Sequence, residues 1–427
     1  MKKNLMIWLT ILLSLNVYTK TVIHAGFLID GSNDNPMNEM SIYVIDNKIT
    51  EVITGYVQPD PDDQYIDLSG YTVLPGLIDM HVHLTSNQSS PKRYLESTRL
   101  NPADYAIRSV NNAKMTLLAG FTTVRNLGDS DAVTVSLRNE ISNGTVLGPR
   151  IFTAGKSIAS TGGHADSTNS LNNELSSDPG PADGIINNSS DAYKAVRHRY
   201  KEGADLIKIT ATGGVLSNAK NGQNPQMTEE EIRSIVDAAR DYGFKVAAHA
   251  HGSEGIIRAV KAGVDSIEHG TLMDEEGMTL MRKEGAYYVP TLLAGAWVAE
   301  KALIEDYYPP FVEKKALEIG PQLISTFSKA YQAGVKIAFG TDTGVTPHGD
   351  NAKEFKLMVD AGMPTKEAIL SATLHASILL GEQENLGSIS KDKFADIIAV
   401  SGNPLEDITT LESVDFVMKD GNVIKKP

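Results

Sequence analysis

The stretch Asp79-Met80-His81-Val82-His83 decides how the chain folds, because two histidines close a long apolar run. The preceding residues, Val73-Leu74-Pro75-Gly76-Leu77-Ile78, are typical of a buried strand. Strand side chains alternate between faces, so the two histidines point the same way and could hold one metal ion. Taken alone, the pair fits a plain strand end at least as well, so a metal site requires further ligands.

From residue 76 onward, apolar runs alternate with amphipathic helical stretches, a pattern typical of a parallel sheet with crossover helices. A capping box at Thr228 and Glu231 marks one helix start, and glycines such as Gly243 and Gly263 mark helix ends. The expected strands are residues 77–83, 122–126, 150–154, 206–210, 245–249, 266–269, 287–292 and 336–340. Eight such units predict a TIM (β/α)8 barrel over residues 76–375, with its chemistry at the C-terminal strand ends.

The segments that flank the predicted barrel contain short strands separated by Asn, Asp and Gly turns. We expect residues 20–75 and 376–427 to pair into one small β-sandwich domain, which the chain leaves and then rejoins. Residues 166–190 are rich in Asn, Ser, Asp and Gly and follow the third barrel strand. This loop is either a lid over the barrel mouth or a mobile insertion.

The composition excludes several classes of function. The 427 residues carry a net charge of −14, which argues against a nucleic-acid-binding surface. The chain has no cysteine, so disulfides, thiolate metal sites and cysteine nucleophiles are excluded. Any metal must therefore be held by His, Asp, Glu or a modified Lys.

The N-terminus has the form of an export signal. Lys2 and Lys3 precede an apolar run over residues 5–15, which is short for a membrane span. We expect residues 1–19 to be a signal peptide cleaved near Thr19, giving an exported protein without stable membrane insertion. An uncleaved membrane anchor is the alternative.

Six residues fall at the ends of predicted barrel strands and could hold metal. They are His81, His83, Lys208, His249, His269 and Asp342. Each histidine or aspartate alone would more often be structural. Their combination at the C-terminal ends of strands in one barrel predicts a metal centre.

Lys208 is the most informative of these residues, because Ile207 and Ile209 flank it in a buried strand. Burying a charged lysine is costly. It could pair with a buried carboxylate, or its neutral amine could react with CO2 to give a carbamate that bridges two cations. The neighbouring histidines favour the carbamate.

Three further histidines are candidates for substrate contact. His164 follows the third strand, His251 lies two residues beyond His249, and His348 follows the eighth strand. An imidazole can bind a carboxylate or an oxyanion. An ordinary loop histidine is the alternative for each of them.

The motifs together resemble the amidohydrolase superfamily over nearly the whole mature chain. The residues that carry the resemblance are 74–83, Gly340-Thr341-Asp342, and the closing segments 386–389 and 395–398. Residues 160–164, 207–209, 213–215 and 249–252 are similar to its binuclear-zinc branch of Xaa-Pro dipeptidases and carboxypeptidases, and ochratoxin-hydrolysing amidases are similar in the same way. His251 departs from some relatives, which have Tyr there, so substrate preference does not carry over.

The resemblance implies a role for each candidate residue. His81, His83 and Asp342 would hold one divalent ion, His249 and His269 a second, and carbamylated Lys208 (N6-carboxylysine) would bridge them with a hydroxide. Zinc is the expected metal. Asp342 would move the proton, and His164 and His251 would bind the substrate carboxylate or the oxyanion.

The predicted function is metal-dependent hydrolysis of a peptide-like amide, such as an Xaa-Pro dipeptide or an N-acyl amino acid. Hydrolysis of a cyclic amide or a lactone is the alternative within the same class. A non-catalytic exported protein that binds metal or ligand is the alternative of another class. The sequence leaves the oligomeric state open, including a homo-oligomer.

Overall fold

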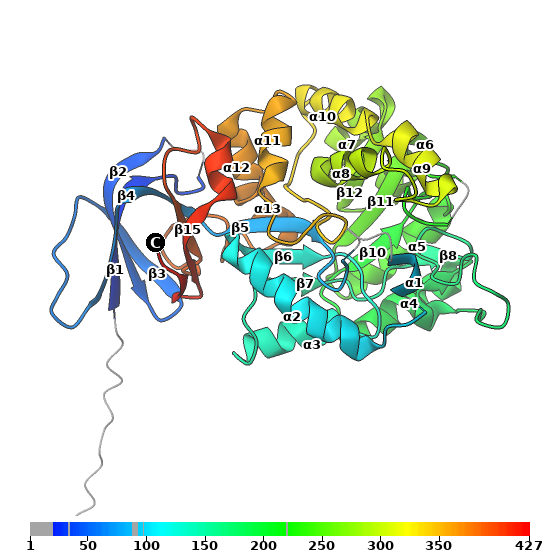
Figure 1. The fold of residues 1–427 in the computed structure, drawn as a ribbon, viewed down its shortest axis with the longest axis horizontal. Helices are drawn as coiled ribbons and strands as arrows, with labels where there is room; N and C mark the ends of the chain where they lie inside the picture. Colours follow the sequence, from blue (N-terminus) through cyan, green and yellow to red (C-terminus); the bar gives the residue numbers. More distant parts are fainter. Residues whose placement is uncertain (1–19, 33–34, 88–92, 97, 219–220) are drawn as a thin grey trace, which may run out of the picture.

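The computed structural model describes residues 20–32, 35–87, 93–96, 98–218 and 221–427. The predicted signal peptide, residues 1–19, lies outside this range. In the described part, no helix combines the length and the apolar character that a membrane crossing needs. A β-sheet built from both chain termini lies at one end of the molecule, beside a larger α/β body (Figure 1).

The two terminal segments share one seven-stranded sheet with the order β16-β15-β14-β4-β1-β2-β3. Its strands are β1 (Lys20–Leu28), β2 (Met37–Ile45), β3 (Lys48–Thr54), β4 (Gln64–Pro75), β14 (Ile397–Val400), β15 (Val414–Lys419) and β16 (Asn422–Lys425). The predicted pairing of N- and C-terminal strands is therefore observed. It occurs between β4 and β14, which are antiparallel.

The two halves of the expected β-sandwich domain are joined by β4 into one sheet. β4 has twelve residues. Most of it runs parallel to β1, and its last residues, Thr72 to Pro75, pair with β14. Residues from both halves, such as Ile23, Ile42, Ile397 and Phe416, share one hydrophobic core.

The α/β body contains the parallel strands that the sequence predicts. One sheet has the order β5-β6-β7 and a second has the order β10-β11-β12-β13, while β8 and β9 form a short pair. The strands are β5 (Leu77–Val82), β6 (Phe121–Asn126), β7 (Arg150–Thr153), β8 (Ala159–Ser160), β9 (Ile185–Ile186), β10 (Ile207–Thr210), β11 (Val246–Gly252), β12 (Ser266–Leu272) and β13 (Tyr287–Val289). All pairings inside these sheets are parallel.

Seven of the eight expected strands are observed with ends shifted by one to three residues, and the eighth is not a regular strand. The seventh ends at Val289 rather than at Leu292, because Thr291 adopts a left-handed backbone with φ of 53° and α8 begins at Leu292. Residues 336–340 form no regular strand. They make isolated backbone hydrogen bonds on both sides, from Ala338 N to Tyr288 O (3.0 Å) and from Met80 N to Phe339 O (2.9 Å).

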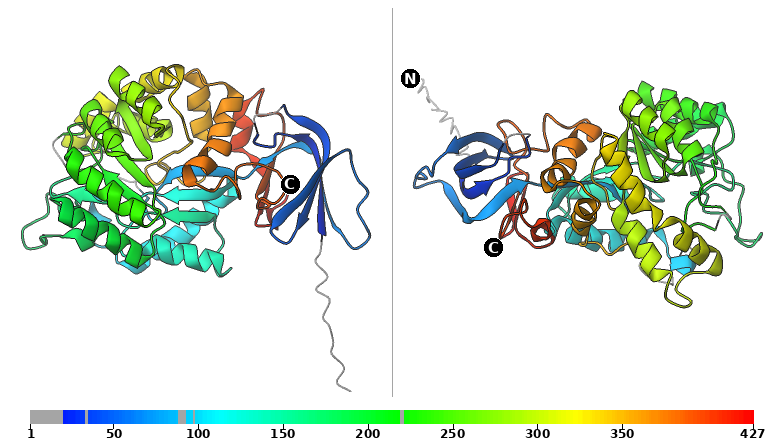
Figure 2. Two further views of the ribbon diagram at one scale, coloured as in Figure 1. Left: turned by 180° about the vertical axis from the view of Figure 1, so that it is seen from behind. Right: turned by 90° about the horizontal axis from the view of Figure 1, so that it is seen from above.

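Helices cover the outside of the parallel sheets (Figure 2). They are α1 (Arg93–Glu96), α2 (Pro102–Leu118), α3 (Val133–Ser142), α4 (Ser189–Glu202), α5 (Glu229–Asp241), α6 (Ser253–Ala262), α7 (Glu275–Glu284), α8 (Leu292–Lys301), α9 (Pro310–Ile319), α10 (Gln322–Gln332), α11 (Lys353–Asp360), α12 (Thr365–Ser371) and α13 (Leu374–Leu380). The predicted capping box of α5 is present, since Glu231 N donates to Thr228 Oγ1 and Thr228 N donates to Glu231 Oε2.

Candidate metal centre

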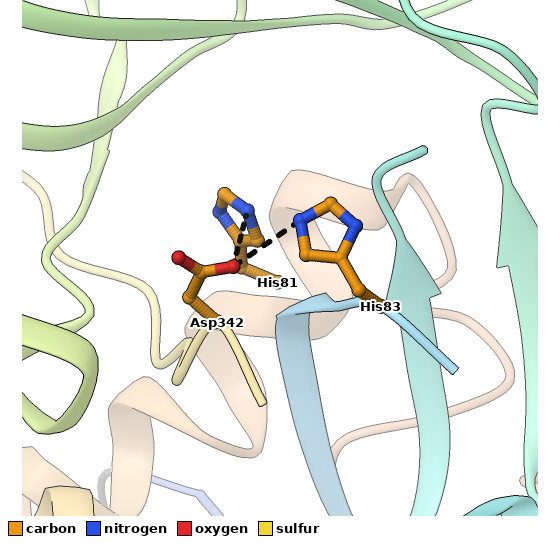
Figure 3. A group of neighbouring side chains, drawn as sticks. All are labelled: His81, His83 and Asp342. Atoms are coloured by element: carbon orange, nitrogen blue, oxygen red, sulfur yellow. Dashed lines mark ion pairs between the residues drawn. The ribbon is translucent and has the colours of Figure 1, made fainter. Parts of the chain in front are cut away.

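His81, His83 and Asp342 converge where β5 ends (Figure 3). The Nε2 atoms of His81 and His83 lie 3.5 Å and 3.2 Å from the Asp342 Oδ1 atom. The strand alternation predicted from the sequence places both imidazoles on the same side, although His83 itself lies just past the last residue of β5. Two nitrogens and one carboxylate oxygen at such distances form a donor set suited to zinc.

Asp79, the first residue of the quoted stretch, fixes the position of Asp342. Its buried carboxylate accepts hydrogen bonds from Thr341 Oγ1 (2.6 Å) and from Asn351 Nδ2 (2.8 Å). Asp342 N in turn donates to His81 O at 2.7 Å. The segment that carries Asp342 is therefore tied to β5 from both sides.

The remaining predicted ligands lie in the same cavity as this cluster. His249 comes from β11, His269 from β12 and Lys208 from β10, and all three line a cavity of about 330 Å³ together with His81 and Asp342. The His269 ring centroid lies 5.0 Å from that of His81 and 4.7 Å from that of His249. The structure thus brings all six predicted ligands together.

Hydrogen bonds on the side away from Asp342 fix which ring nitrogen of His81 and of His83 faces the cluster. His81 Nδ1 donates to Glu268 Oε2 at 2.9 Å, and His83 Nδ1 donates to the Gly128 carbonyl at 3.3 Å. A carboxylate and a carbonyl can only accept, so both imidazoles keep their proton on Nδ1. The Nε2 lone pairs of His81 and His83 are therefore directed toward Asp342, as metal ligation requires.

His249 and His269 are oriented in the same manner. His249 Nε2 donates to the Gly213 carbonyl at 3.0 Å, which leaves Nδ1 as its ligating nitrogen. His269 Nδ1 lies 2.8 Å from Thr291 Oγ1, which leaves Nε2. With one nitrogen of each ring engaged by the protein, the other ring nitrogen of each is a possible metal donor.

Glu268 and Arg125 form a buried ion pair behind His81 that the sequence analysis did not identify. Arg125 Nη2 lies 2.8 Å from Glu268 Oε1, and Arg125 Nε donates to Met80 O at 2.7 Å. Burial alone would raise the pKa of Glu268, but Arg125 and His81 lower it to about 2. The sequence signal that could have identified Glu268 is a charged residue inside an apolar strand, the same feature that identified Lys208.

Burial keeps His81, His249 and His269 in the form that binds metal. Burial lowers the pKa of His81 to about 4 and lowers the pKa values of His249 and His269 well below the ordinary range. Neutral imidazole is the ligating form of histidine. These side chains therefore need not lose a proton at neutral pH before they bind a cation.

The pKa values of Lys208 and Asp342 are both lowered in the cavity, but for different reasons. Burial lowers the pKa of Lys208 to about 8, which makes the neutral amine accessible near neutral pH. Burial opposes the charged form of Asp342, but His81 and His83 lower the pKa of this carboxyl below its usual value. Asp342 is thus an anion facing the histidine nitrogens.

Two of the three predicted substrate contacts line the cavity. His164 stacks on His249 with ring centroids 4.3 Å apart, and its buried Nδ1 has no hydrogen-bond partner among the described residues. Gly214 makes room for this ring, since a Cβ there would lie 2.1 Å from His164 Cε1. His251 also lines the cavity, with Nδ1 held 2.8 Å from Thr271 Oγ1.

His348 and the loop of residues 166–190 do not line the cavity. His348 is absent from the described residues that line it, and its Nε2 lies 3.1 Å from the Ser86 carbonyl. None of the lining residues comes from 166–190 either. That loop instead contacts the segment before it, since Asn169 Nδ2 donates to Gly163 O at 2.7 Å.

Comparison with known proteins agrees with this geometry. The model of the amidohydrolase family matches residues 72–424, which include every candidate ligand. The chain belongs to the amidohydrolase family. Within it, the chain is 32% identical to the ochratoxinase of Aspergillus niger over 439 residues, covering 95% of this chain and 87% of the ochratoxinase.

Two solved structures place this amidohydrolase more narrowly. One is a Xaa-Pro dipeptidase with methionine bound in its active site, with 52% identity and a TM-score of 0.93, covering 95% of this chain and 100% of that chain. The other is a prolidase in complex with N-methylphosphonate-L-proline, with 33% identity and a TM-score of 0.87, covering 96% and 100%. The amidohydrolase is therefore a hydrolase of peptide or amide C–N bonds.

Proposed function

We propose that the protein hydrolyses a small peptide-like amide, an Xaa-Pro dipeptide or an N-acyl amino acid, in a metal-dependent reaction. The observation that carries this proposal is the convergence of six potential ligands in one cavity of about 330 Å³. A cavity of this size suits a small substrate. The similarity to a Xaa-Pro dipeptidase and to a prolidase supports the dipeptide.

The donor set divides into two halves that fit two divalent ions, and zinc is the expected metal. His81, His83 and Asp342 would hold one ion, and His249 and His269 the other. Lys208 would join the two halves as a carbamate formed with CO2. When bound, two cations supply an activated water and polarise the scissile carbonyl.

The protein side chains would carry out the proton transfer and the binding. Asp342, an anion beside two imidazoles, would accept the proton of the attacking water and deliver it to the leaving amine. His164 and His251 would contact the substrate carboxylate or the developing oxyanion, since both line the cavity. Glu268 would keep His81 in the tautomer that ligates.

We also infer that the two parallel sheets are parts of one (β/α)8 barrel. The isolated backbone hydrogen bonds of residues 336–340 connect β13 to β5, and Ile158 forms a parallel bridge with Ile209 of β10. The similarity in fold to the solved dipeptidase, with a TM-score of 0.93, supports this closure.

A combined measurement of metal content and turnover tests the proposed function. The purified protein should contain about two zinc ions per chain, and chelation followed by zinc addition should abolish and then restore hydrolysis. The substrate panel should include Xaa-Pro, Xaa-Arg and Xaa-Lys dipeptides, N-acyl amino acids, a cyclic amide and a lactone. Turnover restricted to the last two would contradict the proposal, and no turnover with full metal would indicate a binding protein.

A further inference from the structure

The cavity has two chemically different sides. The polar side consists of the histidines, Lys208 and Asp342 at the strand ends. The lining also includes an apolar wall, which we define as six residues: Val215, Leu216, Ala294, Val298, Leu323 and Val345. Catalysis by the polar side does not require the wall, so the wall calls for its own explanation.

Helix packing places the wall over the site. Ala294 and Val298 lie one turn apart on α8 and face the cavity together. Leu323 of α10 reaches the cavity past Gly295, where a Cβ would lie only 2.7 Å from Leu323 Cδ2. Val298 and Leu323 are buried, with exposed fractions of 6% and 4%, so the wall is packed against the rest of the protein.

A buried lysine holds the loop after β10, which carries two of the wall residues. Lys315 of α9 donates from Nζ to the carbonyl of Gly214 (2.9 Å) and to that of Ser217 (2.7 Å). These two carbonyls flank Val215 and Leu216. The loop half of the wall is thus held to α9 by charge-assisted hydrogen bonds.

The wall offers no partner for a charged side chain. Among the described residues that line the cavity, Asp342 is the one carboxylate, and it faces the imidazoles of His81 and His83. An ammonium or guanidinium placed against the wall would be desolvated without a counter-charge, which is costly. An alkyl side chain there would instead exchange water contact for contact with Val and Leu side chains.

We propose that the apolar wall binds the side chain of the substrate residue on the acyl side of the scissile amide. It selects uncharged apolar side chains over those of lysine and arginine. The proposal rests on the proposed function and narrows its substrate class. It assigns to Val298 of the wall the role of a specificity-determining residue.

A pair of substrates of nearly equal size tests the wall. Norleucine-proline and lysine-proline differ mainly in the terminal charge. The wild-type kcat/KM should favour norleucine-proline by about 100-fold or more, because the lysine charge would be buried unpaired. Val298→Asp should reduce this ratio to below about tenfold by supplying a counter-charge. Ala296→Asp is the matched control, because it lies on α8 but outside the cavity lining and should keep the wild-type ratio.

The other possible results distinguish failure of the proposed subsite from failure of the proposed function. Equal wild-type kcat/KM for the two dipeptides would overturn the subsite while the proposed function stands. Wild-type turnover of neither dipeptides nor N-acyl amino acids would overturn the proposed function and the subsite with it. If Val298→Asp does not fold, the near-isosteric Val298→Thr should lower kcat/KM for norleucine-proline but not for alanine-proline, and an equal effect on both would contradict the proposal.

Discussion

Lys208 lines the same cavity as the two sets of histidines, and it is buried in β10 between two isoleucines. If its carbamate joins the two metal ions, Lys208→Ala should remove most of the bound metal and the activity together. Metal analysis of the purified variant checks this. Lys245→Ala, at an exposed lysine beside β11, is the control and should bind metal normally. Two ions still tightly bound to Lys208→Ala would refute the bridging role.

Asp342 has two proposed roles, as metal ligand and as proton carrier. Asp342→Asn keeps an oxygen at the same place but cannot accept the proton, so kcat should fall by about 10²–10⁴-fold. Metal content should fall far less. Steady-state kinetics with parallel metal analysis separates the two effects, and Asp350→Asn in the same loop serves as control. Rates near the wild-type value would remove Asp342 as the proton carrier.

Glu268 is expected to act on metal binding through His81. Glu268→Gln places an amide group opposite His81 Nδ1, and this group can donate and thereby favour the tautomer with the proton on Nε2. Metal affinity should therefore fall by about 10–100-fold, as measured by competition with a chelator. An unchanged affinity would show that Glu268 contributes only to packing.

At the scale of elements, backbone conformation at the strand ends turns side chains into the site. His269, Thr291 and Asp342 all have positive φ, at 69°, 53° and 58°. Such conformations are uncommon for residues other than glycine and cost free energy. Their grouping around one cavity indicates that surrounding hydrogen bonds hold these residues in place.

The N-terminus of α8 depends on a carboxylate from a distant helix. Glu354 of α11 accepts hydrogen bonds from Leu292 N (2.8 Å) and Leu293 N (2.6 Å), directly after Thr291. Burial nevertheless raises the pKa of Glu354 from 4.5 to about 8. Between these two pH values the folded protein holds more protons than the unfolded chain, so the free energy of unfolding should decrease as pH rises.

Glu354→Gln removes this titration. The melting temperature of the variant should therefore depend less on pH between about 5 and 8 than that of the wild type. Thermal unfolding at several pH values provides the measurement. Glu300→Gln, at an exposed position of α8, should keep the wild-type dependence. Parallel curves for Glu354→Gln and the wild type would show that Glu354 stays ionised throughout.

At the scale of the molecule, Arg150 connects the α/β body to the terminal sheet. From β7 it donates to Asp396 at 2.6 Å, pairs with Asp420, and lies 4.5 Å over the Phe394 ring. Lys48 approaches the same ring at 3.7 Å. Segments far apart in the chain thus meet at one arginine, where the terminal sheet lies beside the α/β body (Figure 1).

Arg150→Ala should destabilise the protein by roughly 2–3 kcal/mol, because it leaves the buried Asp396 carboxylate without its partner. Activity at low temperature should change little, since Arg150 does not line the cavity. Chemical unfolding followed by circular dichroism gives the free energy. Arg150→Lys should recover only part of the loss, as it lacks the planar fork. Unaltered stability of Arg150→Ala would show that this contact is dispensable.

The local features could be predicted from the sequence alone. Alternation placed His81 and His83 on one side, apolar periodicity gave the parallel α/β class, and the Thr228 capping box gave the start of α5. Lys208 stands out in the sequence because burying a charge within an apolar strand costs free energy in any fold. Each of these signals depends on residues a few positions apart, so it can be recognised without knowing the path of the chain.

Which distant residues meet can be seen only in the tertiary structure. Glu268 reaches His81 across 187 positions and Arg125 across 143. The apolar wall joins α8, α10 and the loop after β10, and β4 connects strands from both ends of the chain in one sheet. Residue types and periodicity do not encode these pairings, because they depend on how whole elements pack. The candidate ligands could therefore be found in the sequence, whereas the fold determines which ring nitrogens face inward and which apolar side chains share their cavity.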